Sequence, residues 1–228
     1  MSKSTNIRKG CKDVWNAFMV EGATFCQPYD IPFCPTTLET IPNKLVPYTE
    51  AKSANGKGGI VHFYIDDYKF NGIDSPLYNR LQTVLDLLRK FDGIITPDFS
   101  TCQDFPEALK IWNTYRMRAF GYYSSKHGIP VVNNVRWGDP DTYDYSFAGL
   151  PENSIFAIST HGCIKQRDNR YRFKIGLLEL YNRLKPHTLL VYGNTPDDIF
   201  DKIRQEGAKI VSYPTYWSQR NQKGGNDE

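Results

Sequence analysis

Polar side chains follow several apolar runs of this sequence, at the point where each run ends. Asp98 and Ser100 follow the run at 93–96, and Pro97 restricts the backbone just before Asp98. An aspartate in this position can act as a general base, as a nucleophile on a sugar carbon or as a metal ligand. The structural alternative is an Asx turn or a cap of the next helix.

A second polar group follows the apolar run at 129–132. It consists of Asn133, Asn134, Arg136, Trp137 and Asp139. Together these residues offer amides, a cation and an aromatic plane, which are the groups that hold a base, a ribose or a phosphate. The structural alternative is that the asparagines satisfy loop carbonyls and that the tryptophan is buried.

A third polar group follows the runs at 154–159 and 188–192. It consists of Thr160, His161, Cys163, Tyr192 and Asn194. A thiolate–imidazole pair can be nucleophilic, but loop residues two apart rarely point together. We therefore expect acid–base or substrate-positioning work from His161, and we pair it with Asp98 as the candidate catalytic residues.

Two further charged runs have both a functional and a structural interpretation. A basic run, which comprises Lys165, Arg167, Arg170, Arg172 and Lys174, can meet phosphates or can be solvated surface. Asp66 and Asp67 end the run at 60–65 and favour a solvated turn over a metal ligand. No HExxH, CxxC or three-cysteine cluster occurs, so we assign no metal site, and the cofactor is unknown.

Strand and helix patterns alternate through residues 60–213 and position these groups. Apolar runs predict about six strands, at 60–65, 93–96, 129–135, 154–159, 188–192 and 209–213. Four helices are predicted between them, and crossovers of this length favour parallel strands. The fold class is α/β, with either an incomplete or compact β/α-barrel-like sheet or an open doubly wound one. Because no strand–helix turn carries GxGxxG, we favour the barrel-like form.

Local patterns predict further features of these elements. Ser75 and Pro76 form an N-cap and first turn before a helix with one leucine-rich face. The next helix, at 105–127, has an apolar side that includes Leu109 and Trp112, and Arg116 and Arg118 lie off that side. The long connection at 137–154 is of a length typical of functional loops.

The flanking segments predict the domain organisation. Residues 1–58 should form an N-terminal part, with a short amphipathic helix at 11–20 and a proline-rich extended strap that packs on the main domain. Residues 59–217 should form the α/β domain, and residues 218–228 a disordered tail.

Composition excludes several classes of protein. The 228 residues suit one α/β domain or at most two small ones, and a net charge of +3 is too small to imply nucleic acid by itself. Five cysteines without a signal peptide favour the reducing cytoplasm. No apolar run approaches the ~20 residues of a membrane span, so no membrane partner is expected.

Five motifs carry a resemblance to a known family: TPDFS at 96–100, WNTYRMRAFGYY at 112–123, NNVRWGD at 133–139, AISTHGC at 157–163 and LKPHTLLVYG at 184–193. In this order they resemble an uncharacterised domain-of-unknown-function family of bacteria, phages and mobile elements of the Firmicutes type. The resemblance covers roughly residues 60–213. It implies a cytoplasmic accessory protein of a phage, plasmid or integrated element, and it implies no activity.

The sequence therefore supports two hypotheses about function. The first is a protein that acts on or binds a nucleic acid or nucleotide at the carboxyl edge of the strands, with catalysis undecided. The alternative is a non-catalytic replication, regulatory or anti-defence factor that engages a host protein. Oligomeric state is open. Proton or glycosidic chemistry requires that Asp98 and His161 converge on one site.

Overall fold

The computed structural model describes residues 13, 15–54, 56, 58–71, 77, 80–216 and 218. The chain divides into two compact units, residues 1–151 and residues 152–228, and each is described by itself. The domain boundaries predicted from the sequence stay a prediction. The first ten residues, the Ser75–Pro76 cap and nearly all of the predicted disordered tail lie outside the described residues.

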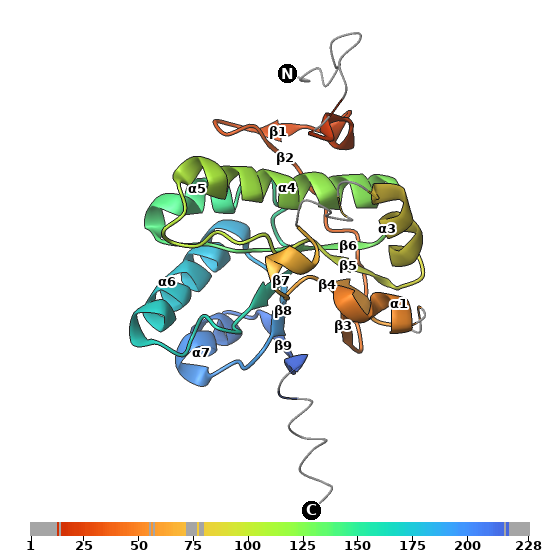
Figure 1. The fold of residues 1–228 in the computed structure, drawn as a ribbon. Coiled ribbons are helices and arrows are strands. Elements are labelled where there is room, and N and C mark those ends of the chain that lie inside the picture. The colour runs from red at the N-terminus through yellow and green to blue at the C-terminus, as the bar shows by residue number, and fades with distance from the viewer. Residues whose placement is uncertain are drawn as a thin grey trace, which may run out of the picture. The chain divides into compact units, whose positions relative to one another are not determined.

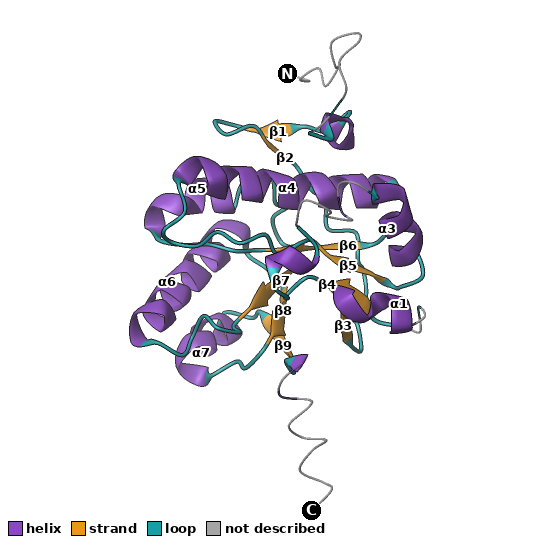
Figure 2. Cartoon of the chain, viewed as in Figure 1, coloured by secondary structure: helices purple, strands orange, loops and turns teal. Residues whose placement is uncertain are grey.

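The first unit contains a parallel sheet whose strands follow the order of the chain (Figures 1 and 2). These strands are β3 (Leu45–Pro47), β4 (Ile60–His62), β5 (Gly93–Ile95) and β6 (Val131–Asn134). Ile60 is in register with Gly93, and Ile94 with Val131. Because β4, β5 and β6 are adjacent and parallel, the residues that follow them lie along one edge.

Helices of the first unit pack on this sheet. They are α1 (Ala51–Ala54), α3 (Leu81–Leu88), α4 (Glu107–Lys126) and α5 (Tyr143–Ser146), and the 3₁₀ turns are η1 (Ala17–Val20), η2 (Tyr48–Glu50), η3 (Asp67–Lys69) and η4 (Pro140–Thr142). The predicted long loop at 137–154 thus contains two short helical turns, η4 and α5.

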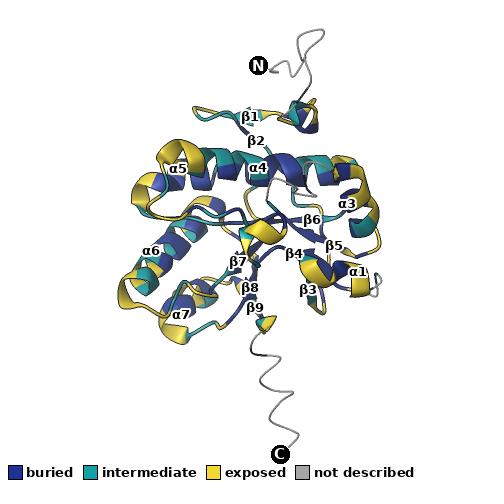
Figure 3. Ribbon diagram, viewed as in Figure 1, coloured by how far each residue is buried: buried dark blue, intermediate teal, exposed yellow. Residues whose placement is uncertain are grey.

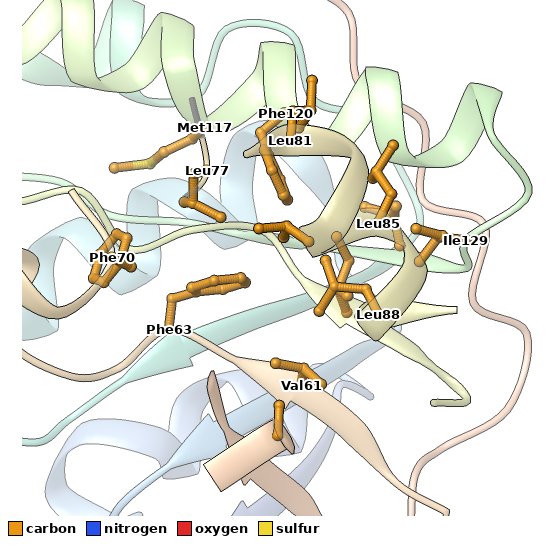
Figure 4. Packing of buried hydrophobic residues seen from close by; sticks show 14 of the residues in the cluster. Val61, Phe63, Phe70, Leu77, Leu81, Leu85, Leu88, Met117, Phe120 and Ile129 are labelled. Atoms are coloured by element: carbon orange, nitrogen blue, oxygen red, sulfur yellow. The ribbon is translucent and has the colours of Figure 1, made fainter. Parts of the chain in front are cut away.

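The core of the first unit forms where α3 and α4 meet the sheet (Figure 4). The predicted leucine-rich face of α3 is buried, and the side chains of Leu85 and Leu88 are 0% exposed. On the sheet side, Phe63 packs edge-on against Phe70. Apolar burial of this kind is the main favourable term in folding.

Helix α4 buries Ala119 and Phe120 of the expected apolar side, but it differs from the expectation at two other residues. Leu109 is 39% exposed, whereas Arg118, expected to lie off the apolar side, is 0% exposed. Gly121 lets the helix approach its neighbours closely, because a Cβ there would lie 2.5 Å from Cys34 Sγ and 2.6 Å from Thr96 Cγ2. The helix-period pattern was therefore an incomplete guide, since close contact and buried hydrogen bonds decide this face.

The segment before the sheet is more structured than predicted. Residues 11, 12 and 14 of the helix expected at 11–20 lie outside the described residues, and Ala17–Val20 forms the 3₁₀ turn η1 in place of α-helix. The proline-rich strap contains a two-stranded antiparallel sheet of β1 (Phe25–Cys26) and β2 (Ile31–Pro32) and then contributes β3. Proline is compatible with these positions because they are short strands at sheet edges.

The second unit contains a parallel sheet of β7 (Ile155–Ser159), β8 (Thr188–Tyr192) and β9 (Lys209–Tyr213). Ile155 is in register with Thr188, and Thr188 with Lys209. The helices are α6 (Arg167–Leu184) and α7 (Asp197–Gln205). All three strands and both crossovers agree with the sequence prediction to within a few residues.

These observations confirm an α/β fold with parallel strands. Within the parallel sheet of each unit, every strand is the neighbour of the next strand in the chain. This sequential order is that of an incomplete β/α barrel, whereas a doubly wound sheet reverses its order at a switch point. The parallel strands number seven, four in the first unit and three in the second, because β3 was not predicted. Within the described residues no helix is long and apolar enough to cross a membrane.

Candidate functional site

Asn134, at the end of β6, is the centre of a hydrogen-bond network at the carboxyl edge of the first sheet. Its side-chain amide donates to Asp98 Oδ1 at 2.8 Å, and its Oδ1 accepts from the hydroxyl of Tyr64 at 3.0 Å. Its backbone N–H donates to Thr96 Oγ1 at 2.8 Å, and its carbonyl accepts from Arg118 at 3.0 Å. Asn134 thereby joins the residues that follow β4 and β5 to helix α4.

Asp98 holds Arg136 at this edge. The second carboxylate oxygen of Asp98 accepts from the Arg136 guanidinium at 2.7 Å. The Asp98 side chain is 13% exposed and that of Arg136 is 32% exposed. The Asp98 carboxylate is thus largely covered, while the Arg136 guanidinium that it orients is still reached by solvent. An ion pair between partly buried groups is screened less by water than a surface pair.

His62 and Tyr64 extend the network along β4. The backbone N–H of Tyr64 donates to His62 Nδ1 at 3.1 Å, so the neutral imidazole carries its hydrogen on Nε2. His62 is 1% exposed, and burial lowers its pKa from 6.5 to about 3. The sequence interpretation of His62 as a structural residue agrees with this position.

Arg118, on helix α4, stabilises the network through hydrogen bonds to backbone carbonyls. Its guanidinium donates to the carbonyls of Asn134, Ser146 and Ala148 at 3.0, 2.8 and 3.1 Å. Burial lowers the pKa of Arg118 to about 10, so the group stays charged at neutral pH. A fully buried cation must be hydrogen-bonded in this way, because an unpaired buried charge is very costly. Arg118 therefore ties the end of β6 to the segment after α5.

The other predicted residues near this edge have separate partners. Ser100 donates from its hydroxyl and its backbone N–H to Asp67, at 2.9 and 3.1 Å. Asp139 accepts from Gln103 at 3.1 Å, and the Trp137 ring packs edge-on against Phe147. The aspartates therefore do not gather, and the described residues contain no group of three or more acids, histidines or cysteines able to hold a metal ion.

Asn133 faces the opposite side of β6 from Asn134. Its amide donates to the carbonyl of Cys34 at 3.0 Å and to Thr36 Oγ1 at 3.3 Å. Its Oδ1 is buried and has no hydrogen-bond partner among the described residues. Successive side chains of a strand alternate between its faces. The two asparagines, which were grouped in the sequence prediction, therefore lie on opposite faces of β6, and Asn133 binds the proline-rich strap.

The predicted residues of the second unit meet at the carboxyl edge of its own sheet. The rings of His161 and Tyr192 lie 6.2 Å apart, edge to face. Thr160 donates to the carbonyl of Asn194 at 2.9 Å. Cys163 Sγ lies 3.5 Å from the backbone carbonyl of His161. The expectation that the side chains of His161 and Cys163 do not point together stays a prediction.

The predicted site residues therefore form two groups, one in each unit. In the first unit Asn134 and Arg136 both donate to Asp98, and in the second His161 lies with Tyr192. The convergence of Asp98 with His161 stays a prediction. The first network also contains Tyr64, Thr96 and Arg118, which were not predicted from the sequence. Tyr64 and Thr96 each lie within two residues of a strand end, and this position could have indicated them.

These features define a class: parallel α/β proteins whose polar side chains collect at the carboxyl edges of the strands. A family profile described as a domain of unknown function, DUF4417, matches residues 23–214, and the chain belongs to this family. This confirms the resemblance stated from the sequence motifs.

Two phage proteins are similar to this chain. The "Gene 1 protein" of Mycobacterium phage L5 is 36% identical over 165 residues, which cover 72% of this chain and 68% of that protein. The "Gene 1 protein" of Mycobacterium phage D29 is 36% identical over 165 residues, which cover 72% of this chain and 57% of that protein. The phage association is thus confirmed, whereas the Firmicutes connection stays a prediction. No solved structure matches.

Proposed function

We propose that this protein is a cytoplasmic accessory factor of a phage or mobile element that binds a nucleotide or nucleic acid at the carboxyl edge of the first sheet. The observation that supports it most directly is the Asp98–Arg136 pair, a guanidinium fixed by a largely covered carboxylate and one-third exposed. The described cysteines are all free thiols, which suits a reducing compartment.

Arg136 would contact phosphate in this proposal. A guanidinium matches the geometry of phosphate oxygens, and a held side chain loses less conformational entropy on binding. Trp137 follows directly in the sequence and is half-buried against Phe147, so it can offer an aromatic plane beside the cation. A cation next to an aromatic plane suits a phosphate joined to a base or ribose.

Asp98 acts as a positioning residue in this proposal. Both of its carboxylate oxygens accept hydrogen bonds, one from Asn134 and one from Arg136. A general base needs an oxygen directed at the proton that it removes. We therefore assign binding to this edge and assign no reaction to it.

Binding assays with Arg136→Gln test this proposal. Nucleoside triphosphates are titrated by calorimetry, and a labelled oligonucleotide by fluorescence anisotropy. Loss of one charged hydrogen bond, worth about 1.5–3 kcal/mol, should weaken binding roughly 10- to 100-fold. Arg89→Gln is the matched control, because Arg89 ends α3 at the other edge of the sheet and pairs only at the surface with Asp86.

Two results would overturn the proposal. One is that the unaltered protein binds none of these ligands. The other is that Arg136→Gln and Arg89→Gln bind equally well. The alternative from the sequence, binding of a host protein, gains support if a stoichiometric host protein co-purifies with both variants and no nucleotide is released on denaturation.

A further inference from the structure

The outward face of α6, in the second unit, carries an exposed tyrosine between two cations. Arg167, Tyr171 and Lys174 stand four and three residues apart, so they form one stripe on the helix surface. The core-facing side of the same helix is marked by Phe173, Leu177 and other apolar residues. Tyr171 is 65% exposed, and Arg167 and Lys174 are exposed. Figure 3 shows that α6 has both exposed and buried positions along its length.

This stripe belongs to a strongly basic stretch. Residues 161–175 contain five Lys and Arg residues and one acid. Arg170 is compensated, because its guanidinium binds both carboxylate oxygens of Asp198 from α7. Among the described residues no hydrogen bond or ion pair involves the side chains of Lys165, Arg167 or Lys174. None of these three exposed cations is therefore held by a hydrogen bond or an ion pair in the described chain, although the charge of Lys174 helps the Arg170 hydrogen bond to lower the pKa of Asp198.

Two other arginines of the second unit do bind acidic residues. On α7, Arg204 binds both Asp197 and Asp201, at 2.9 and 3.0 Å. Near the end of α6, Arg183 binds Glu179 at 2.7 Å. These two arginines thus bind acidic residues on their own helix, whereas Lys165, Arg167 and Lys174 make no hydrogen bond or ion pair with an acid of the described chain.

We propose that the stripe of Arg167, Tyr171 and Lys174, with Lys165 before it, binds the backbone of single-stranded nucleic acid. The two cations of the stripe lie about 10 Å apart along the helix, at 1.5 Å per residue over seven residues. They would contact phosphates on either side of a base that stacks on Tyr171. Stacking on an exposed ring needs an unpaired base, so a single strand fits this surface better than a duplex.

This inference deepens the proposed function and rests on it for the class of ligand. The two surfaces are distinct in their tests, because Arg136 belongs to the first unit and the stripe to the second. Phosphate contacts here would be sequence-independent and strongly dependent on salt. They would add affinity for an oligonucleotide and none for a mononucleotide.

The test measures anisotropy of a labelled 20-nucleotide oligothymidylate between 50 and 200 mM NaCl. Arg167→Gln/Lys174→Gln should bind about tenfold more weakly at 50 mM salt and should lower the slope of log K against log salt by about 1.4, since each phosphate contact on a single strand contributes about 0.7. Tyr171→Ala should weaken binding at every salt concentration and leave the slope unchanged.

The control variant is Lys202→Gln/Lys209→Gln. Both lysines are exposed in the second unit, and the double variant removes the same charge. Unchanged far-ultraviolet circular dichroism confirms that the variants fold. The inference is overturned if the two double variants lose the same slope, or if Tyr171→Ala binds normally. It is also overturned if phosphatidylserine vesicles, and not the oligonucleotide, are bound through the stripe.

Failure of this inference and failure of the proposed function give different results. If Arg136→Gln weakens binding of the nucleoside triphosphate and of the oligonucleotide, and the stripe variants weaken neither, the binding site at Arg136 is supported and the stripe proposal is wrong. If the stripe variants alone weaken oligonucleotide binding, the stripe stands and the assignment of Arg136 fails.

Discussion

Protonation of His62 should destabilise the protein as the pH falls. The pKa of its imidazole is about 3 in the folded chain, against 6.5 for an ordinary histidine. Burial is the cause, and a proton on Nδ1 would also oppose the N–H of Tyr64. Because the folded pKa is the lower one, the unfolded chain binds the proton more readily below pH 6.5. Stability is therefore full above pH 6.5 and is lost progressively toward pH 3.

The size of this effect follows from the two pKa values. Between pH 7 and pH 5 the linkage relation gives a decrease of about 2 kcal/mol in the free energy of unfolding from His62 alone. Below pH 5.5 the slope approaches about 1.3 kcal/mol per pH unit. This is a large share of the 5–15 kcal/mol by which native proteins are stable.

Urea unfolding at pH 7, 6 and 5, followed by tryptophan fluorescence, measures this loss. In His62→Asn the side-chain oxygen can still accept the hydrogen bond from Tyr64 and cannot be protonated in this range. The variant should lose about 2 kcal/mol less than the unaltered protein between pH 7 and pH 5. His187→Asn is the matched control, because it replaces an exposed histidine in the same way.

Parallel pH profiles for the unaltered protein and His62→Asn would refute the reasoning. If the variant does not fold, nitrogen-15 NMR of the unaltered protein decides the matter. One histidine should stay neutral at pH 5 with its hydrogen on Nε2. Four histidines that all become protonated by pH 5 would show that His62 is not buried as described.

Three further substitutions test the packing around the network, each by urea unfolding. Gly121→Ala should lower the free energy of unfolding by about 1–3 kcal/mol, because its Cβ would meet Cys34 and Thr96. Replacing glycine by alanine elsewhere in a helix raises it by about 1 kcal/mol. A variant as stable as the unaltered protein, or more stable, would contradict the close contact. Arg118→Met should cost about 3–5 kcal/mol, because two buried carbonyls and one partly buried carbonyl lose their donor, at about 1–3 kcal/mol for each buried group. A loss below about 1 kcal/mol would show that water reaches them. Tyr64→Phe should cost about 1–2 kcal/mol and weaken nucleotide binding without changing net charge; unchanged binding would separate Tyr64 from the site.

Local signals were enough to predict most of the strands. The run at 188–192 is β8 without change, and its ends are marked by the proline before it and the glycine after it. The segment at 60–65 was predicted three residues too long, because β4 ends at His62. Alternation continues through Tyr64, but the chain leaves the sheet there so that the tyrosine hydroxyl can reach Asn134.

The residues that the sequence analysis misjudged depend on contacts distant in the chain. Arg118 was expected off the buried side because it is displaced from the stripe of apolar residues on the helix. Its partners are backbone carbonyls 16 to 30 residues away. Because every residue has a backbone carbonyl, the residue types do not indicate which carbonyls Arg118 binds. The separation of Asn133 from Asn134, in contrast, follows from the two-residue period of a strand and was available from the sequence.

The arrangement around Asn134 bears on how this edge would recognise a ligand. All four kinds of polar group in this residue, two on the backbone and two on the side chain, already have partners. A ligand that bonded Asn134 directly would have to break one of these buried hydrogen bonds, and the loss would offset the gain. Recognition therefore falls to the exposed end of the network, at Arg136, while Asn134 and Asp98 keep that end in place. A site held in this way binds with little rearrangement, so differences in affinity between ligands should reflect their contacts with Arg136 and not the closure of a loop.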